Sequence, residues 1–189
     1  MVYNEIIKGK FVDLRSITLD DAEFSYNIRA DERFRDTVGQ LAPSLEAQKE
    51  FIEWQMKEPD DYYFVVLNKK GERIGLYGVY NFHDGMAEVG REVNMGSSAE
   101  ALEVSLLVND FCINVLGITK LCSVIYANNP KHISDAIKRG GVCLGKENRG
   151  GHEAVYFEHD ILHDNATMKK IRRMIDVLYK KQQSEDRLT

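Results

Sequence analysis

Cysteine is scarce in this sequence, and its spacing excludes several classes of protein. Only three cysteines occur among 189 residues. Cys112, Cys122 and Cys143 lie far apart, each within an apolar run, so neither a disulfide framework nor a zinc site is indicated. They are instead typical of reduced core residues, which predicts a cytoplasmic protein.

Long apolar runs and an excess of positive charge are also lacking. No apolar run approaches the ~20 residues that a membrane-spanning helix needs. The formal net charge is -5, so the basic footprint of a nucleic-acid-binding protein is missing. We therefore expect neither a membrane nor a nucleic acid as partner. The sequence contains no Gly-x-Ser-x-Gly motif, Walker loop or His/Cys cluster, so triad chemistry, nucleotide hydrolysis and a metal centre find no support.

The residues that are present predict one mixed α/β domain. Hydrophobic residues make up 43% and charged residues 29% of the chain, an ordinary globular balance. No repeat or linker divides residues 1–189, and a helical tail is expected from about residue 164. Seven segments are interpreted as strands, which predicts a largely antiparallel sheet of about six to seven strands flanked by helices: 10–15, 61–67, 72–81, 86–94, 121–126, 142–146 and 154–161.

Two early helices are predicted from their first residues. Thr18 and Asp21 form a capping-box pattern in which Asp replaces the usual Glu. Ser44 is a favourable N-cap for the second helix, which should end near Pro59. Three strands then follow with short turns between them, so we expect an antiparallel meander.

The most informative stretch is 86–141, where the pattern changes to strand, helix, strand and helix. A loop of small residues, 95–99, separates the first strand from an amphipathic helix expected at 100–116. The second strand ends before Asn129 and Pro130, which open another helix. This order places a helix N-terminus beside a strand end, an arrangement that suits a phosphate-bearing cofactor. A capped helix without a ligand is the alternative interpretation.

The complete order resembles that of the GNAT acetyltransferases, in particular the branch with ribosomal-protein and amino-sugar N-acetyltransferases of the pseudaminic acid synthesis type. The resemblance covers residues 11–161. Its local matches are Leu14-Arg15 through Asp20-Asp21-Ala22, Glu88-Val89-Gly90, Leu116 to Leu121, and Asn129 to Gly140. The resemblance implies acetyl-CoA as the donor, with no metal, and a primary amine as the acceptor.

The resemblance also implies which residues bind the donor. The family's pyrophosphate loop has the pattern Gln/Arg-x-x-Gly-x-Gly/Ala, and the shorter loop here matches it as Asn94-x-x-Ser97-x-Ala99. Backbone N–H groups at the start of the helix can still bind an anion. Glu100 and Glu103 suit the helix dipole but would compete with a phosphate. The implied donor-binding residues are Val93, Ser97, Ser98, Ala99, Glu100, Ala101, Asn129 and Lys138.

The catalytic residues are less clearly indicated. Many relatives carry a Tyr on the helix after the Asn that protonates the leaving thiolate, and the matching position here is Ala136. Tyr126 is a weak substitute. Glu88 and Glu92 are candidate general bases, because strand alternation places both on one face, with Gly90 leaving a gap between them. Two surface carboxylates without a catalytic role are the alternative.

The acceptor and the partners stay open. Four arginines in predicted loops, Arg29, Arg33, Arg35 and Arg149, would suit a nucleotide-linked amino sugar, because guanidinium groups match phosphate geometry. The alternatives are a protein N-terminus as acceptor, a non-catalytic acyl-CoA-binding module on the same fold, and an interaction protein that uses its tail helix. Whether the chain forms a homodimer is also open.

Overall fold

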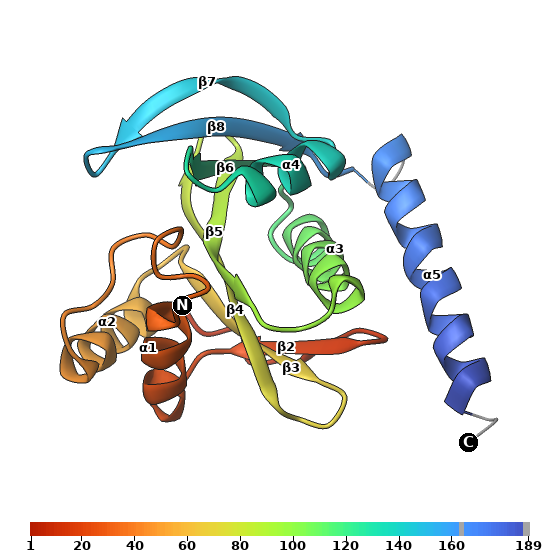
Figure 1. Ribbon diagram of the computed structural model, residues 1–189, viewed down its shortest axis with the longest axis horizontal. Helices are drawn as coiled ribbons and strands as arrows, with labels where there is room; N and C mark the ends of the chain where they lie inside the picture. The colour runs from red at the N-terminus through yellow and green to blue at the C-terminus, as the bar shows by residue number, and fades with distance from the viewer. Residues whose placement is uncertain (163–164, 187–189) are drawn as a thin grey trace.

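A twisted sheet of eight strands runs through the centre of the molecule (Figure 1). The computed structural model describes residues 1–162 and 165–186. The strand order is β1-β2-β3-β4-β5-β6-β8-β7. In chain order, the strands are β1 (Ile7–Lys8), β2 (Val12–Ser16), β3 (Tyr62–Asn68), β4 (Arg73–His83), β5 (Met86–Asn94), β6 (Lys120–Tyr126), β7 (Val142–Arg149) and β8 (His152–Asp160).

The expected mixed α/β class is confirmed, but the expected six to seven strands are too few. The additional strand is β1, whose two residues are too short for side-chain alternation to be recognised in the sequence. The meander of β3, β4 and β5 is antiparallel, as predicted, and β5 pairs with β6 in parallel.

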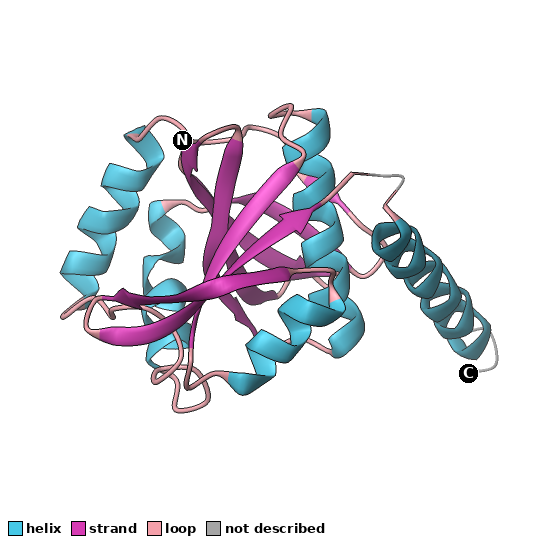
Figure 2. Cartoon of the chain, turned by 90° about the horizontal axis from the view of Figure 1, so that it is seen from above, coloured by secondary structure: helices cyan, strands magenta, loops and turns pink. Residues whose placement is uncertain are grey.

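Helices cover both faces of the sheet (Figure 2). They are α1 (Ala22–Ala30), α2 (Leu45–Lys57), α3 (Ser98–Asn114), α4 (Pro130–Lys138) and α5 (Ala166–Asp186), with a short 3-10 turn before α1. Tyr63 and Val65 of β3 face α1 and α2, whereas Phe64 and Val66 face α3. Because β3 is buried on both faces, its sequence is a nearly continuous apolar run.

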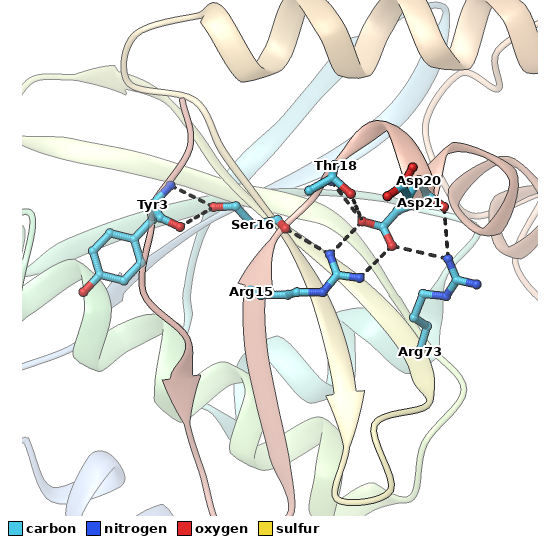
Figure 3. Close-up of polar contacts among 7 residues, drawn as sticks. All are labelled: Tyr3, Arg15, Ser16, Thr18, Asp20, Asp21 and Arg73. Atoms are coloured by element: carbon cyan, nitrogen blue, oxygen red, sulfur yellow. Dashed lines mark hydrogen bonds and ion pairs between the residues drawn. The ribbon is translucent and has the colours of Figure 1, made fainter.

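The turn from β2 into α1 is fixed by a buried carboxylate (Figure 3). Asp21 is 1% exposed and accepts two hydrogen bonds from the Arg15 guanidinium, both 2.7 Å long. It also accepts from the N–H and hydroxyl of Thr18, at 2.9 and 3.0 Å. Burial would raise the pKa of Asp21, but these donors outweigh it and lower the pKa. The predicted capping-box pairing of Thr18 and Asp21 is therefore present.

The tail forms a helix that packs on the outer side of α3 (Figure 1). The expected start, about residue 164, lies outside the described residues, and α5 begins at Ala166. Met168, Ile171 and Ile175 contact Leu106 of α3. No helix in the described ranges 1–162 and 165–186 is both long and apolar enough to cross a membrane.

The expectation that all three cysteines are core residues is wrong for one of them. Cys112 and Cys122 are buried, but Cys143 is exposed on β7. β7 is the last strand of the sheet and pairs only with β8, and most of its residues are exposed. An apolar run at a sheet edge therefore resembled a core segment in the sequence.

Candidate active site

The strands β5 and β6 part from each other soon after they begin. Only Met86, Ala87 and Glu88 pair with β6, through Lys120, Leu121 and Cys122. β5 continues to Asn94 and β6 to Tyr126 without further pairing between them. The two strands therefore enclose a gap, which opens toward the start of α3 and the start of α4.

A cavity of about 50 Å³ lies where the strands part. Helix α4 contributes three side chains spaced by four and three residues, so that they share one helix face. The residues that line the cavity include Val89, Gly90 and Glu92 from β5, Leu121 and Ser123 from β6, His132 and Ala136 from α4, and Arg139 at the C-cap of α4.

Glu92 is the acidic group of this cavity. Its carboxylate lies 3.5 Å from Nε2 of His132 and 3.7 Å from the Arg139 guanidinium, and the side chain is 13% exposed. Burial disfavours the charge of Arg139, but Glu92, Tyr77 and Asp135 together outweigh burial and raise the pKa of Arg139. Burial and Glu92 together raise the pKa of Tyr77, which therefore stays neutral.

His159 of β8 completes the polar lining. Its Nε2 lies 3.0 Å from the Ser123 hydroxyl. Burial, with smaller contributions from Arg139 and His132, lowers the pKa of His159 to about 4. Near neutral pH this ring is therefore uncharged, and the charged or titratable groups closest to Glu92 are Arg139 and His132.

A β-bulge places Glu88 and Glu92 on opposite faces of the sheet, so the expected shared face is wrong. Gly90 pairs with Gly78 and Val93 with Leu76, which leaves two residues of β5 opposite one residue of β4. Arg91, inside the bulge, has a φ of 52°. The extra residue reverses the alternation, so that Glu92 faces α4 while Glu88 faces the side of α1 and α2.

Glu88 is enclosed by donors. Its carboxylate is 5% exposed and accepts a bidentate pair from Arg149, at 2.6 and 3.0 Å. Tyr80 and Asn81 donate to the same carboxylate, each at 3.1 Å. These four donors fix the Glu88 carboxylate and bond to both of its oxygens. A general base would need one of those oxygens free to accept a proton. The geometry thus favours a structural role for Glu88.

Position 90 has to be a glycine because the Tyr80 side chain lies directly over it. A Cβ at this position would lie 2.5 Å from the Tyr80 hydroxyl. The guanidinium of Arg91 lies 4.0 Å from the centre of the Tyr80 ring and pairs with Asp61 at 2.7 Å. The part of β5 that borders the gap thus contains a glycine and is fixed to β4 by a packed cation–π contact.

The start of α4 has the expected Asn. The Oδ1 of Asn129 accepts from the N–H of His132 at 3.1 Å, so Asn129 is the N-cap of α4 and lies at the end of β6. The cap uses the side-chain oxygen of Asn129 and not its amide nitrogen. Ala136 is buried in the cavity wall. Lys138 is 72% exposed and 3.5 Å from Asp135, on the outside of the helix.

The start of α3 is capped by its own side chains. Ser97 is the N-cap, with Ser98, Ala99, Glu100 and Ala101 in the first turn, and Val93 is buried on the opposite face of β5 from Glu92. Glu103 does not face this terminus, contrary to expectation. It is buried and accepts three backbone N–H bonds of 2.6–2.9 Å from the β1–β2 turn, residues 10–12.

Comparison with protein families identifies the domain. A family model of the acetyltransferase (GNAT) domain matches residues 12–140. The chain belongs to the GNAT acetyltransferase family. The match begins with β2 and ends with α4, so it includes both walls of the gap in this GNAT domain. No curated protein sequence matches the chain significantly.

Solved structures show the same fold at low sequence identity. A GCN5-related N-acetyltransferase from Brucella melitensis is 15% identical, with a TM-score of 0.77 over 92% of this chain and 86% of that one. The apo form of FdhC, a nucleotide-linked sugar GNAT, is 20% identical, with a TM-score of 0.74 over 91% and 97%. A protein described as a ribosomal-protein-serine acetyltransferase from Vibrio cholerae is 21% identical, with a TM-score of 0.70 over 85% and 99%.

The sequence alone did not indicate the polar cluster around Glu92. His132 and Arg139 lie on an exposed-looking amphipathic helix, and His159 lies in an ordinary alternating strand. A usable signal was present in α4, because residues 132, 136 and 139 recur at the spacing of one helix face. That face contains Ala136, whose small side chain leaves room for a cavity.

Proposed function

We propose that this GNAT domain transfers an acetyl group from acetyl-CoA to the primary amine of a small molecule, with a nucleotide-linked amino sugar as the preferred acceptor class. The observation that carries the proposal is the gap between β5 and β6, which opens on a cavity containing Glu92. The family membership supports acyl transfer, and the polar groups at the gap support an amine as nucleophile.

The gap fits an extended pantetheine arm. Two parallel strands that no longer pair leave backbone N–H and C=O groups free to bond with amides of a ligand. Asn129, at the open end of β6, offers an amide nitrogen for the same purpose. Acetyl-CoA supplies an activated acyl group as a thioester, and the chain's own residues have to orient it and manage protons.

Glu92 is the proposed general base. An amine attacks only in its neutral form, so a proton has to leave it near the carbonyl carbon. Glu92 lies beside the gap, and His132 and Arg139 hold its carboxylate in place. As the new C–N bond forms and the C–S bond breaks, the amine gives one proton to Glu92 and the thiolate takes one proton from solvent. Glu92 then releases its proton to solvent, which restores the carboxylate. Glu88 is assigned to positioning, because its four donors already use its oxygens.

The arginines support an anionic acceptor on the other side of the gap. The loop 31–43 is tied to the end of β6, where Asn128 donates to the carbonyl of Asp36 at 2.8 Å. Arg33 and Arg35 lie on this loop, 60% and 53% exposed, and Arg149 reaches in from the β7–β8 hairpin. Guanidinium groups from two segments suit the diphosphate of a sugar nucleotide. Arg33 and Arg35 are exposed and can exchange their present carboxylate partners, Asp31 and Asp36, for phosphate, whereas Arg149 would contact phosphate while it stays paired with Glu88.

A panel of acceptors tests the proposal. We expect acetyl-CoA to raise the melting temperature of the protein and expect turnover with nucleotide-linked amino sugars, but not with peptides that carry a free N-terminus. The opposite preference would assign the chain to protein N-terminal acetylation. Binding of acetyl-CoA without turnover on any amine would identify a non-catalytic acyl-CoA-binding module.

Substitution of the proposed base tests the mechanism. Glu92→Gln should lower kcat by about 10²–10⁴-fold with little change in the Kd of acetyl-CoA, because the amide cannot accept the proton. Glu147→Gln, on the exposed strand β7, is the matched control and should leave kcat unchanged. A Glu92→Gln enzyme with normal kcat would show that another group or water removes the proton.

A further inference from the structure

The first turn of α3 is occupied by a carboxylate from its own helix. Oε2 of Glu100 accepts the N–H of Ser97 at 2.7 Å, and the Ser97 hydroxyl accepts the N–H of Glu100 at 3.3 Å. Oδ1 of Asn94 accepts the N–H of Gly96 at 2.7 Å. Three backbone donors of the β5–α3 loop and the helix start are therefore bonded within the chain.

The carboxylate also fills the space above the loop. A Cβ at Gly96 would lie 2.8 Å from Oε2 of Glu100 and 2.9 Å from Oδ1 of Asn94. The glycine is thus closely covered by the two acceptors. In the described part of the chain, the N–H groups of Ser98 and Ala99 are the ones left at this terminus for an external anion.

The resemblance to GNAT enzymes implies that the donor's pyrophosphate would lie at the start of α3. Helix N-termini attract anions through their free N–H groups and the helix dipole. Here Glu100 accepts the N–H of the N-cap residue Ser97 and places a negative charge at the helix start. That charge would lie beside any phosphate that bound to the remaining N–H groups of Ser98 and Ala99. The residues present do not fit a pyrophosphate as well as the gap fits a pantetheine arm.

We propose that Glu100 takes the position of the donor's pyrophosphate and that this enzyme recognises its donor chiefly by the acyl-pantetheine arm. The inference rests on the proposed function, because it concerns the same donor. It makes Glu100 a residue that determines donor specificity. The adenosine diphosphate portion of acetyl-CoA then contributes little to affinity.

The substitution Glu100→Gln separates charge from capping. Glutamine at this position of a capping box still accepts the N–H of the N-cap residue, so the helix start is preserved. Only the negative charge is removed. The matched control is Glu46→Gln, which removes an acidic residue from the first turn of α2, away from the gap.

Calorimetric titration of the full chain with acetyl-CoA and with acetyl-pantetheine measures the effect. For the wild-type protein we expect dissociation constants for the two donors within about tenfold of each other. Glu100→Gln should tighten acetyl-CoA binding by about tenfold, as expected for removing one charge a few ångströms from a phosphate near the surface. The Kd of acetyl-pantetheine should not change, and Glu46→Gln should change neither constant.

Two results would overturn the inference. One is a wild-type affinity for acetyl-CoA that exceeds the affinity for acetyl-pantetheine by more than a hundredfold. The other is an unchanged or weaker affinity for acetyl-CoA in Glu100→Gln. Either result leaves the proposed function standing, because acetyl-CoA still binds. Failure of both donors to bind both proteins would instead reject the proposed function and, with it, this inference.

Discussion

At the scale of single residues, His159 gives the cavity a defined pH dependence. Its pKa in the folded protein is about 4, whereas an unfolded histidine titrates near 6.5. Between these values the unfolded state binds more protons than the folded state, so the free energy of unfolding falls as the pH falls. Above pH 6.5 the residue has no such effect.

We therefore predict that acidification from pH 7 to pH 5 lowers the free energy of unfolding by about 2 kcal/mol through this residue. His159→Gln keeps a polar group beside Ser123 and should remove that part of the pH dependence. Urea unfolding at both pH values measures it. His152→Gln, at the exposed β7–β8 turn, is the control and should retain the wild-type slope. An unchanged slope in His159→Gln would contradict the assignment.

Residue roles were predictable from the sequence where they depend on local structure. Asn129 before Pro130 and Thr18 before Asp21 have the cap positions expected from their neighbours. The shared face of Glu88 and Glu92 was wrong because of the bulge at Arg91. Positive φ is favoured by glycine, and an arginine in that conformation gives no local signal. The Arg91 side chain contacts Tyr80 of β4 and Asp61, which immediately precedes β3, so its partners are distant in the sequence.

At the scale of elements, α5 shows what spacing can and cannot predict. The tail residues Met168, Ile171, Met174, Ile175 and Leu178 have helical spacing, and the helix is present. Only Met168, Ile171 and Ile175 are buried, whereas Met174 and Leu178 are 44% and 36% exposed. The apolar stripe in the sequence is wider than its contact with α3, because one neighbouring helix covers only part of it.

This contact should stabilise the protein measurably. We predict that Ile171→Ala lowers the free energy of unfolding by about 2–4 kcal/mol, because its side chain is 7% exposed between α3 and α5. Val177→Ala is the matched control: Val177 is 66% exposed, and we expect a change within about 0.5 kcal/mol. Equilibrium unfolding in urea compares the two. Equal, small effects would show that α5 does not pack on α3 in solution.

At the scale of the whole molecule, the sheet consists of two parts that meet along a short seam. Strands β1 to β5 form one part, and β6, β8 and β7 form the other. Seven residues of β6 pair with β8, but only three pair with β5. The order of strands and helices was predictable because each element has a local pattern. The parting of β5 and β6 was not predictable, because pairing between strands that are separated by a helix in the sequence depends on tertiary contacts and not on a local pattern.

The short pairing between β5 and β6 predicts which backbone amides of the sheet exchange their hydrogens fastest. Backbone amides of β5 and β6 beyond the seam lack the ladder partners that protect β3 and β4 on both sides. We expect segments 89–94 and 123–126 to exchange faster than segments 63–66 and 76–79 in the free protein. A saturating donor bound between the strands should slow exchange in the first two segments and leave the other two unchanged. Equal protection of all four segments without a ligand would mean that the two parts of the sheet are closed in solution, and the gap would then be unable to admit a pantetheine arm.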